Sequence, residues 1–242
     1  MIEIIRIHNE LLGTYGDQGN AEVLKFRAIA RGIDAKVIDI SYREAIPQSG
    51  DIYLLGGAED AAQLLSVARL REDGGFATAI NNGAQVLAIC AAYQILGQTF
   101  YADGNKVAGL DLIPVETLPG NFAPGNESNT KRFVGDISID CNWLGSNQNN
   151  VTGFENHGGY TRHLESNSQP FGLVRKGYGD GLGSTDGIIH NSIYATYLHG
   201  PLLARNPQVA DHLLQLIIKS PLTLFTDEIA QEYAQERRES FK

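Results

Sequence analysis

Two side chains far apart in the sequence have the chemistry for nucleophilic catalysis by a thiol. Cys90 follows an apolar run, residues 85–89, and two alanines come after it, a pattern that predicts a strand, a sharp turn and the start of a helix. A thiol at that turn would lie over the helix N-terminus, where unpaired N–H groups and the helix dipole favour the thiolate. His199 ends a second strand-like run, residues 193–198. Its imidazole can take the proton of a thiol and return it to a leaving group.

Both residues also have a structural interpretation that involves no chemistry. Free cysteine is among the most buried residue types, and at the end of a core strand it is commonly a small hydrophobic residue. A histidine at the end of a strand is commonly a hydrogen-bonded polar residue. The pairing of Cys90 with His199, each at the end of its own strand, favours catalysis over burial alone.

Four sequence blocks carry a family resemblance that covers the chain from Ile4 to about Leu216. They are, in order, Leu55–Gly57, Ala88–Gly97, Gly153–Gly159 and Tyr197–Pro201. In these blocks the chain resembles class I glutamine amidotransferases of the cobyric acid synthase-like branch. Within that branch it is similar to the GatD family, the glutaminase subunits of lipid II isoglutaminyl synthases. The resemblance implies an α/β fold, a three-layer sandwich with a central, mostly parallel sheet and β-hairpins added in the second half of the chain.

The reaction expected from this resemblance is hydrolysis of the side-chain amide of glutamine. Cys90 would attack the amide carbon, His199 would protonate the departing ammonia, and His199 would then activate the water that hydrolyses the glutamyl thioester. The tetrahedral intermediate carries an oxyanion, which needs preorganised N–H donors. The backbone N–H of Ala91 directly follows the nucleophile, and the resemblance supports Gly57 as the second donor. The alternative for Gly56 and Gly57 is a plain turn after a core strand.

Free glutamine is a zwitterion, so the site must also bind a carboxylate and an ammonium group. The resemblance implies that Arg132 binds the carboxylate, for which a guanidinium fork is suited; the alternative is a surface charge. Gln94 lies one helical turn after Cys90, and the resemblance gives its amide a role in orienting the substrate. His157 falls in a block that resembles the family's second substrate-side loop. We do not expect His157 to be a base, because His199 fills that role.

The segment after His199 departs from the wider class. Many class I members carry a glutamate two residues beyond the catalytic histidine, where it orients the imidazole, whereas this chain has Pro201. A proline side chain cannot accept that hydrogen bond. The sequence therefore predicts that an Asp or Glu of a partner subunit docks beside His199 and completes a triad.

Composition restricts the classes of partner and cofactor. The 242 residues carry a formal net charge of −9, which argues against nucleic-acid binding, since that needs clustered Lys and Arg. No Cys or His cluster has the spacing of metal ligands, so we expect no metal site. The glycine-rich segment Gly13–Gly19 fits neither the dinucleotide nor the P-loop pattern and predicts a turn that caps a helix starting near Gln18. We therefore expect no cofactor on this chain and place ATP and Mg²⁺ on the partner subunit.

The pattern along the chain predicts one domain over residues 1–242, with a charged C-terminal tail from about residue 221. Strand-like and helical runs alternate through the first half, and short strands with Gly- and Asn-rich turns follow in the second. A turn-rich segment, residues 117–127, predicts a loop. No apolar run is long enough to span a bilayer and Met1 leads directly into a strand, so we expect a cytoplasmic location. Cys141 lies in a polar stretch, and we expect no role for it.

The function predicted from the residues and the resemblance is that of a glutaminase subunit. It would supply ammonia to a Mur-ligase-like, MurT-type partner in a heterodimer, which amidates the D-glutamate α-carboxyl of the lipid II stem peptide. One alternative is an amidotransferase of the cobyric acid synthase type that acts on corrinoids. Another is a non-catalytic scaffold or regulatory binding module in which the thiol is merely buried.

Overall fold

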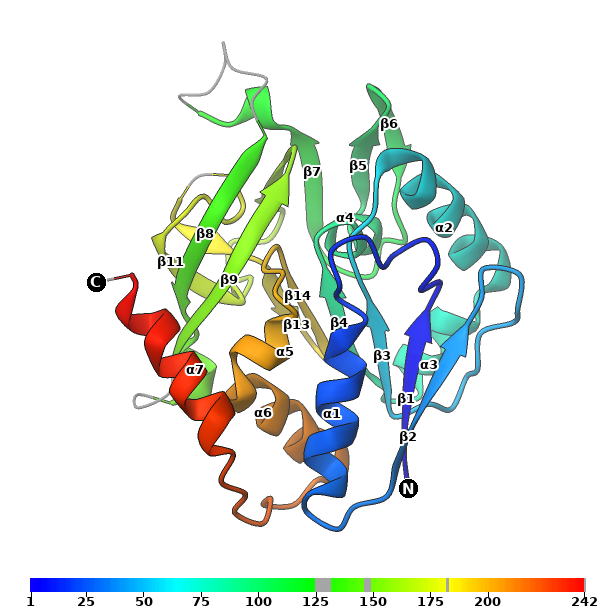
Figure 1. The fold of residues 1–242 in the computed structure, drawn as a ribbon. Coiled ribbons are helices and arrows are strands. Elements are labelled where there is room, and N and C mark those ends of the chain that lie inside the picture. Colours follow the sequence, from blue (N-terminus) through cyan, green and yellow to red (C-terminus); the bar gives the residue numbers. More distant parts are fainter. Residues whose placement is uncertain (125–131, 146–148, 182, 242) are drawn as a thin grey trace.

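A six-stranded sheet forms the centre of the molecule in the computed structural model, which describes residues 1–124, 132–145, 149–181 and 183–241 (Figure 1). All neighbouring strands are parallel except the pair at one edge, β13 (Ile188–His190) and β14 (Ile193–Thr196). Two central strands, β3 (Ile52–Leu55) and β4 (Gln85–Ile89), are apolar along almost their whole length, as expected for parallel strands that are covered on both faces. In spatial order the strands are β13 (Ile188–His190), β14 (Ile193–Thr196), β4 (Gln85–Ile89), β3 (Ile52–Leu55), β1 (Ile2–Ile7) and β2 (Ala35–Ile40).

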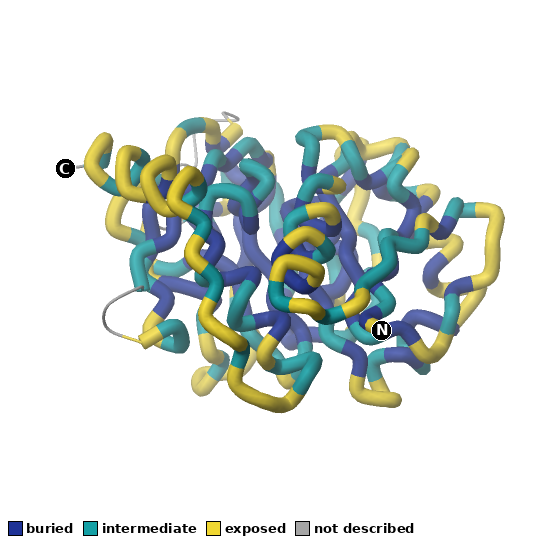
Figure 2. Tube along the Cα trace, turned by 60° about the horizontal axis from the view of Figure 1, so that its bottom comes forward, coloured by how far each residue is buried: buried dark blue, intermediate teal, exposed yellow. Residues whose placement is uncertain are grey.

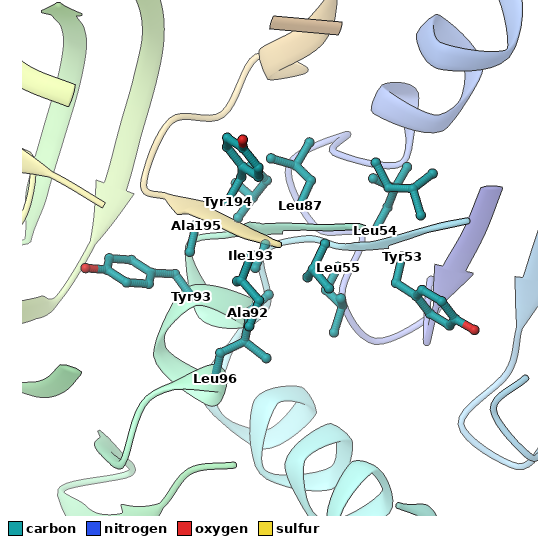
Figure 3. Packing of buried hydrophobic residues seen from close by; sticks show 14 of the residues in the cluster. Tyr53, Leu54, Leu55, Leu87, Ala92, Tyr93, Leu96, Ile193, Tyr194 and Ala195 are labelled. Atoms are coloured by element: carbon teal, nitrogen blue, oxygen red, sulfur yellow. The ribbon is translucent and has the colours of Figure 1, made fainter. Parts of the chain in front are cut away.

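Helices cover both faces of this sheet. One layer contains α1 (Gly19–Ile29), α5 (Leu202–Arg205) and α6 (Pro207–Ile218), and the other contains α2 (Asp60–Asp73), α3 (Gly75–Asn81) and α4 (Ala91–Leu96). Side chains alternate between the two layers: Leu54 and Leu87 point to one side of the sheet and Leu55 to the other (Figure 3). Exposed residues lie mainly along the outer faces of the helices, while the central strands are buried (Figure 2). The three layers match the expected α/β sandwich.

The hairpins of the second half only partly extend the central sheet. The β13–β14 hairpin does so, as expected. Other strands build two separate four-stranded sheets, which the sequence did not predict. One has the order β10 (Gly159–His163), β7 (Val115–Pro119), β5 (Thr99–Ala102), β6 (Asn105–Ala108); the other has the order β12 (Thr185–Asp186), β11 (Gly172–Lys176), β8 (Phe133–Asp140), β9 (Asn150–His157).

Parts of the predicted loop and of the charged C-terminal tail form regular structure. Residues 117–122 of the predicted loop form the end of β7 and a 3₁₀ turn (Gly120–Phe122), whereas residues 125–131 lie outside the described ranges. A second 3₁₀ turn covers Asn142–Leu144. The charged tail contains helix α7 (Glu228–Glu239), which is mostly exposed (Figure 2). Its N-cap residue, Asp227, accepts the Ala230 N–H at 3.1 Å.

No helix in the described ranges combines the length and apolar character needed to cross a membrane.

The order of the central strands determines where a site can form. The chain leaves β1 toward β2 on one side and returns to β3 on the other side of β1. A crevice opens at such a reversal, at the carboxyl ends of the strands. The connections after β1 and after β3 meet there, and the ends of β4 and β14 are next along the same edge. Cys90 and His199 are therefore brought to neighbouring positions.

Candidate active site

Cys90 occupies a strained turn between β4 and α4. Its backbone angles are φ 55° and ψ −106°, a conformation that non-glycine residues rarely adopt and that is found where function requires it. The Cys90 N–H donates to the Thr196 carbonyl at 2.9 Å, which ties the turn to β14. Cys90 occupies the N-cap position of α4 and is 5% exposed. The strand, turn and helix predicted around Cys90 are thus present.

His199 follows β14, the strand next to that of the nucleophile. Its backbone pairs with Phe154 in both directions, with N···O distances of 3.1 and 2.8 Å. The ring is 2% exposed and lies against Tyr15, with ring centroids 4.6 Å apart. The carboxyl ends of two adjacent parallel strands therefore deliver the thiol and the imidazole to one place, as the sequence predicted.

The carboxylate that orients His199 comes from this chain, not from a partner. Asp17 Oδ2 lies 2.9 Å from His199 Nδ1, and Asp17 is itself buried. Since an ionised carboxylate only accepts hydrogen bonds, Nδ1 carries the proton and Nε2 is left for the thiol. The prediction that a partner residue completes the triad was wrong. Pro201 stands where many class I members carry the orienting glutamate. In this chain the turn after β1 supplies the carboxylate instead, through Asp17.

Sequence reasoning missed Asp17 because its segment was interpreted only as a turn before a helix. That turn does lead into α1, and the Asp17 carbonyl accepts the Asn20 N–H at 3.0 Å. The available signal was position: a lone carboxylate in the connection after the first strand of a parallel sheet lies at the edge where functional groups gather. Tyr15, on the same turn, was missed as well.

The environment of His199 favours its protonated form. Burial lowers the pKa of the imidazole, but the negative charge of the Cys90 thiolate and the hydrogen bond to Asp17 outweigh burial and raise the pKa to about 10. His199 is thus an imidazolium near neutral pH. It can supply the proton that an amide leaving group needs.

Gly57 has a different role from the one predicted for its N–H group. The N–H donates to Asp17 Oδ2 at 3.0 Å, so in this structure it holds the triad carboxylate and does not point at an oxyanion. The absence of a side chain matters too. A Cβ at Gly57 would lie 2.8 Å from His199 Cε1 and 3.0 Å from Tyr15 Cδ2. Ala91, the other predicted donor, is the first residue of α4 and lines the site cavity; its role stays a prediction.

We expect Gly57→Ala to displace the His199 ring and to lower kcat for glutamine hydrolysis about 100-fold. The reason is that a shift of about 1 Å at a reacting group costs a factor of this size. Steady-state kinetics of the variant, with its unfolding temperature measured alongside, checks this expectation. A stable variant with wild-type kcat would show that the ring does not need the space that glycine leaves.

A cavity of about 220 Å³ opens beside the thiol. Its wall contains most of the residues that the sequence singled out, together with three carboxylates that can receive an ammonium group. The residues concerned are Cys90, Ala91, Gln94, Arg132 and His157, and Glu59, Asp60 and Asp103. The cavity therefore combines a nucleophile with opposite charges of the kind that a zwitterionic amino acid requires.

Arg132 is at the rim of this cavity and is exposed. Its guanidinium donates to both oxygens of Asn156: Nε to Oδ1 at 2.9 Å and Nη2 to the carbonyl at 3.0 Å. The same carbonyl lies 3.9 Å from Cys90 Sγ. Asn156 Nδ2 in turn donates to Tyr15 Oη at 3.2 Å. The arginine is thus held close to the nucleophile, and its binding to a substrate carboxylate stays a prediction.

Gln94 and His157 line the cavity but have protein partners. The amide of Gln94 is bonded at both ends, to Gln63 at 2.9 Å and to Tyr197 at 3.1 Å. His157 stacks on Tyr197 with ring centroids 3.6 Å apart, and its Nδ1 lies 2.9 Å from the Gly159 carbonyl, to which it must donate. Contact of either residue with substrate stays a prediction.

The remaining predicted sites are remote from this chemistry or untested. Cys141 is fully buried, and burial raises the pKa of its thiol, so it is a poor nucleophile. Among the residues that the structure describes, no three His, Cys, Asp or Glu side chains are grouped to hold a metal ion.

Comparisons with known proteins identify a family for this chain. Residues 3–207 match the family model of the CobB/CobQ-like glutamine amidotransferase domain. The chain is 34% identical to the lipid II isoglutaminyl synthase (glutamine-hydrolyzing) subunit GatD of Staphylococcus aureus, with 88% of this chain and 83% of that protein covered. It is 31% identical to the subunit of the same name from Streptococcus pneumoniae, with 97% and 90% covered.

A solved structure supports the fold. The structure of PurLQS from Thermotoga maritima superposes with a TM-score of 0.60 at 13% identity, covering 90% of this chain and 98% of that one. The family match extends over the Cys90 elbow, the Asp17 turn and the His199 strand, which together form the site described above. The chain therefore belongs to the CobB/CobQ-like glutamine amidotransferase family.

Proposed function

We propose that this chain is the glutaminase subunit of a lipid II isoglutaminyl synthase. The observation that carries the proposal is the buried Cys90–His199–Asp17 arrangement beside a cavity with both charges. The similarity over most of their lengths to two GatD subunits points to the pathway. The names of those relatives also imply a second subunit, so the ammonia released here is used elsewhere in a complex.

In the proposed mechanism, the Cys90 thiolate attacks the side-chain amide carbon of glutamine. The N–H of Ala91, at the start of α4, would donate to the oxyanion that forms. His199 passes its Nε2 proton to the amide nitrogen, and ammonia leaves. His199, now neutral, takes a proton from water, and the resulting hydroxide hydrolyses the glutamyl thioester to glutamate. Asp17 holds the ring in one tautomer throughout.

The partner in this proposal is a Mur-ligase-like subunit that forms a heterodimer with this chain in the cytoplasm. It would bind ATP and Mg²⁺, activate the D-glutamate α-carboxyl of the lipid II stem peptide and receive the ammonia. Activation by ATP is needed because a free carboxylate does not react with ammonia at neutral pH.

The test is reconstitution. The chain and a co-purified Mur-ligase-like partner are incubated with lipid II, ATP, Mg²⁺ and glutamine, and amidated lipid II is quantified by mass spectrometry. We expect amidation with wild type, and with Cys90→Ala only when ammonium chloride replaces glutamine. Amidation of a corrinoid in place of lipid II would contradict the pathway, and release of no glutamate from glutamine under any condition would contradict the glutaminase itself.

A further inference from the structure

A buried chain of hydrogen bonds runs from the helix of the nucleophile to the wall of the cavity. It begins at Gln63, whose Nε2 donates to the Ala91 carbonyl at 3.2 Å and to Gln94 Oε1 at 2.9 Å. Gln94 Nε2 then donates to Tyr197 Oη at 3.1 Å. The three side chains are buried, so their hydrogen bonds are not exchanged with water.

The donor and acceptor in each of these hydrogen bonds are fixed. The Ala91 carbonyl can only accept, so the Gln63 atom beside it must be the amide nitrogen. The atom of Gln94 that faces this nitrogen must then be the amide oxygen. It follows that the nitrogen of Gln94 faces Tyr197, and that the tyrosine hydroxyl accepts from it.

The same reasoning extends through two threonines. Burial raises the pKa of Tyr197, so its hydroxyl keeps the proton, and Thr161 Oγ1 lies 2.6 Å away to accept it. Thr161 Oγ1 lies 2.8 Å from Thr117 Oγ1, its neighbour across β7 and β10. Thr161 then has its own proton to donate, and within the described part of the protein the other oxygen found at hydrogen-bonding distance from its hydroxyl is Thr117 Oγ1, so the proton goes to Thr117. The Thr117 hydroxyl accepts from Thr161 and has one proton left to donate.

That proton is directed to a ligand. Thr117 is 2% exposed and lines the cavity beside Cys90, and no acceptor for its hydroxyl is found in the described ranges of the chain. Gly159 allows this close arrangement, since a Cβ there would lie 2.4 Å from Thr117 Cγ2 and 2.6 Å from Gln94 Nε2. We propose that the Thr117 hydroxyl donates a hydrogen bond to the α-carboxylate of the substrate glutamine.

The substrate offers only two kinds of acceptor, its carboxylate and its amide oxygen. The amide oxygen must lie near the Ala91 N–H if Cys90 is to attack the carbonyl. The ammonium group has no lone pair and cannot accept this proton. Thr117 shares its side of the cavity with Arg132: β7 ends at Pro119, Gly120 N–H donates to the Gly158 carbonyl at 2.8 Å, and a Cβ on Gly158 would lie 3.8 Å from Arg132 Nη1.

The test compares glutamine with 4-aminobutanamide, which is glutamine without its α-carboxyl. The measured quantity is kcat/KM for glutamine divided by kcat/KM for 4-aminobutanamide, determined on the full chain with its co-purified partner. For Thr117→Val, which keeps the shape but removes the hydroxyl, we expect the ratio to fall about 10- to 100-fold, mainly through KM for glutamine. Thr117→Ser is the matched control and keeps a ratio close to that of wild type.

A second variant tests the direction of the hydrogen bonds. Tyr197→Phe leaves the ring but removes the donor to Thr161, so Thr117 becomes free to turn its proton toward Thr161. We expect the ratio to fall, by less than in Thr117→Val. If Thr117→Val leaves the ratio unchanged, whether because neither substrate is affected or because both lose equally, the carboxylate contact is wrong. The inference rests on glutamine hydrolysis by this site, which wild-type turnover of glutamine checks separately.

Discussion

Cys90→Ser is expected to lower glutamine-dependent activity by at least about 10⁴-fold while the fold is unchanged. The substitution is almost isosteric, but a serine hydroxyl is not ionised beside His199 and is a far weaker nucleophile toward an amide. Glutamate release from glutamine measures the effect, and the unfolding temperature shows that the structure persists. Ammonia-driven amidation by the complex should continue, because it bypasses the thiol.

Selective labelling provides the control for this prediction. A diazo-ketone analogue of glutamine should modify Cys90 and leave Cys141 intact, since Cys141 is fully buried and its pKa is raised by burial. Peptide mass spectrometry locates the adduct, and Cys141→Ser should retain activity. Modification of Cys141 alone, or normal turnover by Cys90→Ser, would overturn the assignment of the nucleophile.

The second large effect concerns Asp17, for which two substitutions separate charge from orientation. Asp17 Oδ2 accepts from both Gly57 N–H and His199 Nδ1. An asparagine with its oxygen in this place can accept the same two bonds, so Asp17→Asn removes mainly the charge. We expect kcat to fall about 10- to 100-fold. Asp17→Ala also removes the acceptor, and we expect about 10³-fold, below the roughly 10⁴-fold known for a serine nucleophile because a thiol depends less on its base.

The pH profile distinguishes this role from a purely structural one. His199 must be protonated to release ammonia, so wild-type kcat should decline as pH rises through the His199 pKa of about 10. Asp17 raises that pKa, and its charge is lost in Asp17→Asn, so the decline should move to lower pH. Asp34→Asn, an exposed carboxylate before β2 at the opposite edge of the sheet, is the matched control and should leave the profile in place.

A partner carboxylate is not required for this triad. Changing an acidic residue of the partner near His199 to its amide should not reproduce the effect of Asp17→Asn on the glutaminase rate of the complex. If the partner variant lost activity and Asp17→Asn did not, Asp17 would not be the orienting group in the assembled enzyme.

The sequence by itself determined the parts of the protein that depend on local patterns. The apolar run before Cys90 predicted strand β4, and the alternation of strand-like and helical runs in the first half of the chain predicted a parallel sheet, since parallel strands need helical crossovers between them. The small residues after Cys90 predicted the sharp turn at this residue, since a tight turn leaves no room for bulky side chains there. The placement of Cys90 and His199 at strand ends also followed, because parallel strands in one sheet end at one edge.

Only the tertiary structure decided contacts between segments that no local pattern links. Asp17 and His199 are 182 positions apart, and nothing near either residue specifies their hydrogen bond. It depends on the order of the strands, which places the connection after β1 in the crevice beside β3 and β14. The role of Gly57 changed for the same reason, because its N–H meets whichever carboxylate the crevice contains. Pairing of hydrogen-bond donors and acceptors in a buried space is a property of the assembled fold, so the sequence predicted the nucleophile and base but not the residue that orients them.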